Sequence, residues 1–151
     1  MPTHAEKRQL PYTPEQMFEL VADVEKYPEF LPWCVATRIK SHHGDTITAD
    51  MVIGYKVFRE RFTSIARLDR AAMRIDIAYQ EGPFRFLNNH WVFERAPNGC
   101  VIDFYIDFEF SSHLLEKAIT VVFNRAVSVM VEAFERRAKA MYRPEAGKAR
   151  I

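Results

Sequence analysis

The chain has 151 residues, of which 48% are hydrophobic and 27% charged, and its formal net charge is +1. This composition predicts one globular domain over residues 1–151, with a flexible tail at 143–151. The near-neutral charge excludes a general electrostatic drive toward nucleic acid, so DNA is not an expected partner. Cys34 and Cys100 lie far apart, which argues against a disulfide framework or a zinc knuckle and fits a reducing compartment.

Targeting and membrane-spanning segments are not expected. The first ten residues are rich in charge and contain no apolar stretch typical of a secretory signal. The most apolar stretch, 118–131, includes Arg125 and is shorter than the roughly 20 residues that a membrane span needs. We therefore expect a cytoplasmic protein.

A first helix is predicted from Thr13 to about Glu25. Thr13 is a suitable N-cap, Pro14 fits the first helical position, and Glu15 favours the positive end of the helix dipole. Apolar residues follow at helical spacing. Prolines at 28 and 32 exclude a longer helix, so residues 28–33 are expected to form a short turn or helix.

From residue 35 to residue 110 the hydrophobic period is two, which predicts strands of an antiparallel sheet. In the last strand, alternate residues from Ile102 to Phe110 are apolar and those between them are polar. Turn signals at 43–45, 81–83 and 97–99 separate neighbouring strands. Six strands fit this region, and a seventh at about Glu6–Tyr12 is expected at an edge. The predicted class is therefore α+β, with a meander of about seven strands.

One long helix is predicted from about residue 113 to Tyr142, a length of about 45 Å. Two apolar stripes run along it side by side, and the second comprises Phe123, Val127, Met130 and Phe134. The helix must therefore bury more than the usual apolar arc. Its second stripe is expected to line a cavity under a curved sheet, or to face a membrane or another subunit.

Polar residues form no recognisable metal or nucleophile motif. The five histidines lack the spacing of metal ligands, and no metal site is expected. Asp103, Asp107 and Glu109 share a strand face, either as an acid–base set or, more simply, as a solvated surface. A series of arginines could bind phosphate or RNA, or could also be a solvated face: Arg59, Arg61, Arg67, Arg70 and Arg74.

The aromatic and methionine residues indicate an apolar cavity. A large sheet twists away from a straight helix, which leaves space between the two. A pocket with few polar groups suits a long apolar ligand better than a reacting substrate. The residues expected to line it and bind the ligand are Phe30, Leu31, Trp33, Met51, Ile53, Phe62, Ile77, Trp91, Phe104, Ile106, Phe123, Val127 and Met130.

The run from Asp23 to Cys34, Asp-Val-Glu-Lys-Tyr-Pro-Glu-Phe-Leu-Pro-Trp-Cys, carries a resemblance. Together with the preceding residues 11–22, it looks like the opening of the coenzyme Q-binding START-domain family, within the polyketide cyclase and START superfamily. The similarity continues through Gly82-Pro83-Phe84, Trp91-Val92-Phe93 and residues 108–112. It therefore covers nearly the whole chain.

This resemblance implies a helix-grip fold, in which a curved antiparallel sheet wraps around the C-terminal helix and encloses a hydrophobic tunnel. It also implies a carrier or chaperone that binds ubiquinone or a polyprenyl precursor and supports respiration and quinone biosynthesis. Ubiquinone would then be the ligand, with no other cofactor. Some bacterial members of the family are called ribosome association toxins, so the ribosome is the alternative partner. The resemblance also fits a bacterial protein, or a mitochondrial one on the matrix side.

A second alternative is a cyclase or aromatase of the same superfamily, which would need polar groups that converge inside the tunnel. The candidates are Asn89, His90 and Tyr105, although an inward His90 would turn Trp91 outward. We therefore predict no catalytic residue and a protein that is not an enzyme.

Two further segments are expected to form functional surfaces. Pro28 and Pro32 restrict the segment 27–33, which is expected either to frame the tunnel mouth or to form a hydrophobic plug. The basic C-terminal end is expected to contact a membrane surface, such as the inner membrane, without inserting, or else to be a solvated helix end. Its basic residues are Arg136, Arg137, Lys139, Arg143, Lys148 and Arg150.

Overall fold

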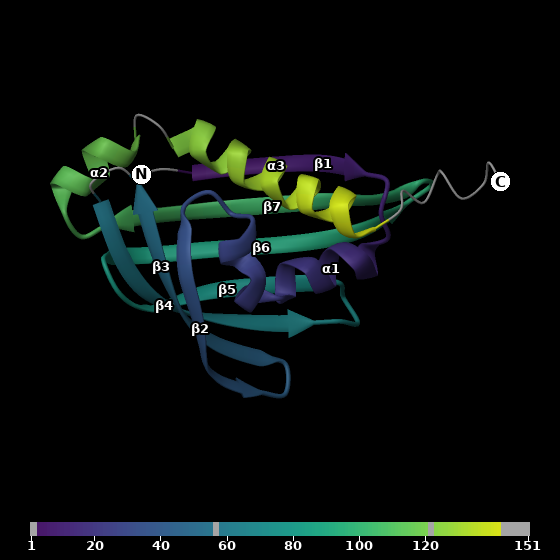
Figure 1. Ribbon diagram of the computed structural model, residues 1–151, viewed down its shortest axis with the longest axis horizontal. Helices are drawn as coiled ribbons and strands as arrows, with labels where there is room; N and C mark the ends of the chain where they lie inside the picture. Colours follow the sequence, from purple (N-terminus) through teal and green to yellow (C-terminus); the bar gives the residue numbers. More distant parts are fainter. Residues whose placement is uncertain (1–2, 56–57, 121–122, 143–151) are drawn as a thin grey trace.

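The computed structural model describes residues 3–55, 58–120 and 123–142. Seven antiparallel strands form one sheet in the order β1-β7-β6-β5-β4-β3-β2, with β1 at an edge (Figure 1). The predicted seven-stranded meander with an N-terminal edge strand is therefore confirmed, although the edge strand is Thr3–Leu10 and not Glu6–Tyr12. The strands are β1 (Thr3–Leu10), β2 (Cys34–His43), β3 (Thr46–Tyr55), β4 (Phe58–Asp69), β5 (Arg74–Glu81), β6 (Phe84–Ala96) and β7 (Gly99–Phe110).

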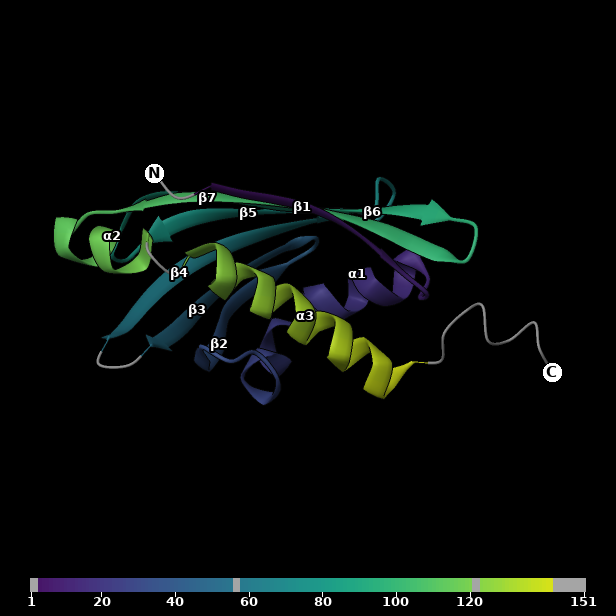
Figure 2. The ribbon, with the colours of Figure 1, turned by 90° about the horizontal axis from the view of Figure 1, so that it is seen from above.

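The helical elements lie on one side of this sheet. They are α1 (Pro14–Ala22), the 3₁₀ helix η1 (Val24–Glu29), α2 (His113–Thr120) and α3 (Phe123–Met141). Figure 2 shows that the sheet curls, so that β2, β3 and β4 turn toward the side occupied by α3. This arrangement is the expected helix-grip fold, and the curl leaves space between α3 and the strands.

The start of α1 follows its predicted capping chemistry. The Thr13 hydroxyl accepts a hydrogen bond from the Gln16 backbone at 3.0 Å, and the Gln16 side chain accepts one from the Thr13 backbone. This reciprocal pair is a capping box. The helix ends at Ala22 instead of continuing to about Glu25, and the chain goes on as η1. The short helical segment therefore begins at Val24, before the predicted Pro28.

The C-terminal region differs from the prediction of one straight helix. The structure describes two helices, α2 and α3, which are not in line with each other (Figure 1), and residues 121–122 lie outside the described residues. At the end of α2, the Thr120 hydroxyl donates to the Glu116 carbonyl at 2.7 Å, an interaction that bends helices.

The inward faces of the strands follow the predicted alternation. On β7, Ile102, Phe104, Phe108 and Phe110 are buried, each with at most 6% of its surface exposed. A register shift between Phe84 and Phe86 makes β6 bulge, so that Phe84 and Leu87 are both buried. The core therefore lies between the concave face of the sheet and the helices.

Candidate ligand-binding cavity

An apolar cavity of about 290 Å³ lies between the sheet and α3. Its walls come from η1, from strands β2 to β7 and from both C-terminal helices. Pro32 is exposed and its neighbour Trp33 is half-buried, so the cavity opens to solvent beside this segment. Its volume is close to the lower end of the ~300–1,000 Å³ typical of small-molecule sites.

All but two of the predicted lining residues are at this cavity. Those that line it are Leu31, Trp33, Met51, Ile53, Phe62, Ile77, Trp91, Ile106, Phe123, Val127 and Met130. Phe30 does not line it, because its ring packs against Phe134 with 5.1 Å between centroids, on the flank of α3. Phe104 does not line it either, because it lies in the core against Trp91, 4.6 Å between centroids.

Sequence reasoning missed several lining residues. Phe108 and Phe110 were placed on an inward face but not in the cavity, and the strand period was the signal that could have placed them there. Phe134 was expected at the cavity as part of the second stripe but was not included among the ligand-binding residues. The small residues Gly54, Ala66 and Ala126 also line it, and their short side chains leave part of its volume unfilled. The polar residues Ser64, Asn89 and Glu60 line it as well.

Two polar side chains on the cavity wall have hydrogen-bonding capacity to spare. Ser64 on β4 is 7% exposed, and its hydroxyl has no hydrogen-bond partner among the described residues. Asn89 on β6 donates one of its two side-chain N–H groups to the Tyr105 carbonyl at 2.8 Å, and its other N–H and its side-chain carbonyl have no partner in the described part of the chain. Of the three polar residues proposed for an enzyme, only Asn89 faces the cavity. His90 and Tyr105 stack on each other on the opposite face, 5.3 Å between ring centroids.

Three lining side chains can ionise. Tyr27 is buried and donates its hydroxyl to the Val21 carbonyl, and burial raises its pKa. Burial also raises the pKa of the Cys34 thiol to about 11, so it stays protonated at neutral pH. Glu60 lies on β4 opposite Ile53, and its carboxylate forms no ion pair with any described residue. Neither Tyr27 nor Cys34 is therefore prepared for nucleophilic chemistry.

The two flanks of α3 are held by different kinds of contact. On one flank, Phe134 packs edge-on against Tyr27 and Phe30, and the Arg137 guanidinium lies 5.1 Å from the Phe30 centroid. Arg137 also pairs with Glu29 at 2.8 Å. This predicted membrane-surface residue is therefore committed to an intramolecular contact.

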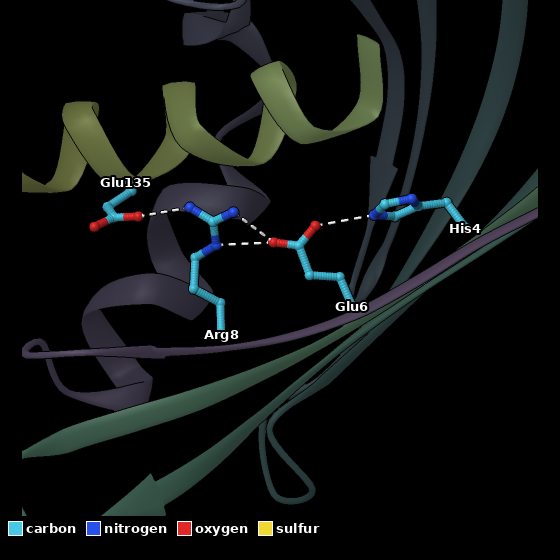
Figure 3. Close-up of polar contacts among 4 residues, drawn as sticks. All are labelled: His4, Glu6, Arg8 and Glu135. Carbon is cyan, nitrogen blue, oxygen red and sulfur yellow. Dashed lines mark hydrogen bonds and ion pairs between the residues drawn. The ribbon is translucent and has the colours of Figure 1, made fainter. Parts of the chain in front are cut away.

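On the other flank, α3 meets a chain of charged residues on β1 (Figure 3). The Glu6 carboxylate bonds to His4 at 2.9 Å and to Arg8, and Arg8 reaches Glu135 on α3, also at 2.9 Å. The His4 ring lies 6.4 Å from the Phe123 ring at the cavity wall. This chain of charged residues therefore links the edge strand to α3 and contacts the cavity-lining Phe123 through His4.

The basic residues predicted to form surfaces do not all lie together. Arg136 and Lys139 are exposed on α3, whereas Arg143, Lys148 and Arg150 lie outside the described residues. Of the arginine series, Arg59, Arg61 and Arg67 are exposed on β4, while Arg70 pairs with Glu19 and Arg74 pairs with Asp76.

Asp107 accepts hydrogen bonds from Asn88 and Tyr105, and Glu109 pairs with Arg85. These contacts favour a solvated face over an acid–base set. Within the described ranges there is no metal-binding group of three or more His, Cys, Asp or Glu. No described helix is both long enough and apolar enough to cross a membrane.

Comparison with known proteins identifies the family. Residues 10–135 match the family described as polyketide cyclase/dehydrase and lipid transport. The chain is 38% identical to the ribosome association toxin RatA of Rickettsia prowazekii, over 86% of this chain and 91% of that protein. It is also 30% identical to the mitochondrial coenzyme Q-binding protein COQ10 homolog B of Xenopus laevis, over 92% of this chain and 59% of that protein.

Solved structures share the fold. The 18 kDa protein CC1736 of Caulobacter crescentus is 36% identical and superposes with a TM-score of 0.77, over 93% of this chain and 98% of that one. The ZhuI aromatase/cyclase of Streptomyces is only 14% identical but has a TM-score of 0.84, over 94% and 96% of the two chains, so its likeness concerns the fold alone. Sequence and structure agree that the chain belongs to the polyketide cyclase/dehydrase and lipid transport family.

Proposed function

We propose that the protein binds ubiquinone or a polyprenylated precursor in the cavity and carries it without changing it chemically. The observation that carries this proposal is the apolar cavity between the sheet and α3. Each buried methylene of a tail contributes about 0.8 kcal/mol, which outweighs the loss of tail freedom after a few isoprene units. The likeness to a coenzyme Q-binding protein supports the same ligand class.

The lining chemistry favours binding over catalysis. Tyr27 is held by a backbone carbonyl, and Cys34 is protonated at neutral pH. Glu60 is the ionisable lining residue that remains, and no described His, Lys or Arg lines the cavity beside it. A cyclase would need several groups that converge on its substrate, so we favour a carrier.

Calorimetric titration of the delipidated protein tests this proposal. We expect saturable binding, one to one, of a ubiquinone with a two-isoprene tail, and much weaker binding of the same ring without a tail. Absence of saturable binding with either compound would contradict the proposal. A straight-chain fatty acid serves as a control for nonspecific apolar binding.

Ribosome association is the second candidate, and a group of exposed cations supports it. Arg38, Lys40 and Arg61 surround Asp50 on the outer face of β2 to β4. The hydrogen bond from Thr63, followed by these cations, keeps the pKa of Asp50 below its usual range. The likeness to proteins named ribosome association toxins points to the same partner.

Ribosome pelleting tests this candidate. Replacement of Arg38, Lys40 and Arg61 by Gln should abolish co-sedimentation, because phosphate contacts need these charges and weaken steeply with salt. Arg95→Gln is the control, because Arg95 is also exposed but lies on β6 and pairs with Glu15 on α1. Equal pelleting of the triple variant and the control would exclude this surface.

A further inference from the structure

The cavity wall offers a hydrogen-bond acceptor without a partner as well as donors. One of the two Asn89 side-chain N–H groups donates to the Tyr105 carbonyl, so Asn89 presents its second N–H and its carbonyl oxygen to the cavity. Ser64, nine-tenths buried, presents a hydroxyl that can accept or donate. The Cys34 thiol is only a weak donor. A ligand that brings only acceptors can pair with the second N–H of Asn89 but leaves its carbonyl oxygen without a donor.

Ser64 and Asn89 are spaced to hold the two ends of one ring. In the register, Ala66 on β4 pairs with Ile77 on β5, which pairs with Asn89 on β6. Ser64 is two residues from Ala66 on the same inward face, so the Cα atoms of Ser64 and Asn89 lie roughly 12 Å apart. Two inward side chains at this separation leave room for an aromatic ring with an oxygen at each end.

We infer that the cavity selects a ring lipid whose head group carries hydroxyls, a hydroquinone or a phenol, over the fully oxidised quinone. The inference rests on the proposed function and names the chemical form of its ligand. One ring hydroxyl donates to the Asn89 carbonyl, and a second hydroxyl or an ether oxygen bonds to Ser64. The carbonyl and methoxy oxygens of a quinone accept only, so a quinone can pair with Ser64 and with the second N–H of Asn89 but leaves the Asn89 carbonyl unpaired.

The position of Ser64 and Asn89 also orients the ligand. Both lie on the concave face of the sheet, away from the cavity opening. Glu60 lies four residues before Ser64 on β4 and pairs with Ile53. Ile53 in turn pairs with Cys34, which lies at the cavity opening. A head group on the floor leaves its tail along Phe62 and Leu31, toward the opening near Pro32. A tail longer than the cavity can then extend outward.

Paired titrations under anaerobic conditions test the inference. The probes are a hydroquinone with a two-isoprene tail, the corresponding quinone, and the dimethyl ether of the hydroquinone. For the unmodified protein we expect the hydroquinone to bind at least about tenfold more tightly than the other two, because a buried acceptor left unpaired costs about that factor or more. The comparison with the dimethyl ether uses only the unmodified protein, so it tests the inference even if a variant fails to fold.

Two variants locate the preference. Asn89→Leu removes the acceptor at similar volume, so it should weaken hydroquinone binding and bring the two affinities together. Asn88→Leu is the matched control, because Asn88 is the exposed neighbour of Asn89, bonds to Asp107 and should leave the ratio unchanged. If all probes bind equally, or if Asn88→Leu changes the ratio as much as Asn89→Leu, the inference is wrong while the carrier proposal stands. If none binds, the carrier proposal itself fails.

Discussion

Arg8 on the edge strand and Glu135 on α3 are joined by an ion pair of 2.9 Å, and Arg8 also bonds to Glu6 beside it (Figure 3). This chain of charges ties the C-terminal helix to the strand at the edge of the sheet. The Glu6 side chain is 16% exposed. Burial raises its pKa, but the hydrogen bonds to His4 and Arg8 outweigh burial, and the pKa of Glu6 is lowered from 4.5.

This lowered pKa predicts acid sensitivity. A carboxylate with a folded-state pKa below its unfolded value stabilises the fold above the unfolded pKa, and the stabilisation is lost as the pH falls through the folded pKa. The free energy of unfolding of Glu6→Gln should therefore fall below that of the original protein at pH 6.5, and the gap should close below about pH 4. Urea unfolding at both pH values measures it. A gap that does not change with pH would contradict this account.

Gly82 is predicted to be essential for the shape of the cavity wall. Its φ is +144°, and a Cβ there would lie 2.6 Å from the Cβ of Phe62, which lines the cavity. Gly82→Ala should therefore displace Phe62, lower stability by more than about 2 kcal/mol and weaken ligand binding. Gly44→Ala is the control: its φ is +57°, but nothing lies within 4 Å, so only backbone strain of about 1 kcal/mol is expected. Equal effects of the two variants would exclude the steric explanation.

Cys34 is predicted to react slowly and to report on the ligand. Because burial raises the pKa of its thiol from 9.0 to about 11, its thiolate is roughly a hundredfold less abundant at pH 8 than in an ordinary thiol. Iodoacetamide labelling, followed by mass spectrometry, should be correspondingly slow and slower still with bound ligand, because Cys34 lines the cavity. Labelling as fast as in the urea-unfolded chain would show that the thiol is accessible.

The small side chain of Ala126 on α3 is predicted to leave the space that the ligand occupies. A phenylalanine there would extend into the cavity and occupy the space of the ligand, so Ala126→Phe should abolish binding. The apo protein should lose little stability, because the new ring is buried in apolar space. Ala140→Phe, at an exposed position of the same helix, should bind normally. Binding retained by Ala126→Phe would place the ligand elsewhere.

The exposed cations of α3 are predicted to contact anionic membranes. Each basic residue near such a surface contributes about 1 kcal/mol, so replacement of Arg136 and Lys139 by Gln should weaken binding to anionic vesicles in flotation assays. Arg137→Gln should chiefly lower the melting temperature instead, because Arg137 is engaged with Glu29 and Phe30. Equal binding to neutral and anionic vesicles would contradict a role for charge.

The strands and the first helix could be predicted because their signals are local. The alternation from Ile102 to Phe110 predicts a strand because one of its two faces is apolar. Thr13 followed by Pro14 predicts the start of a helix without any contact from another element. The difference in direction between α2 and α3 was missed because the apolar period continues from one helix to the other, whereas the hydrogen bond from the Thr120 hydroxyl to the Glu116 carbonyl acts on the backbone.

The cavity was predictable as an apolar space but not in its polar details. Phe30 and Phe104 have the same composition signal as the lining residues, and only packing against Phe134 and Trp91 removes them from the wall. Ser64 shares the inward face with Phe62 and Ala66, but a small polar residue has no hydrophobic signal that would place it in the cavity. Long-range packing and the placement of polar residues therefore decide the residues that matter most for ligand choice.

Mass spectrometry of lipid extracted from the purified protein tests the central claim most directly. The protein and its Ala126→Phe variant would be produced in a bacterium that makes ubiquinone, then purified identically and extracted. We predict that a polyprenylated phenol, hydroquinone or quinone is recovered from the original protein in near-stoichiometric amount and is absent from the variant. Equal recovery from both proteins, or a lipid with no prenylated ring, would contradict the account.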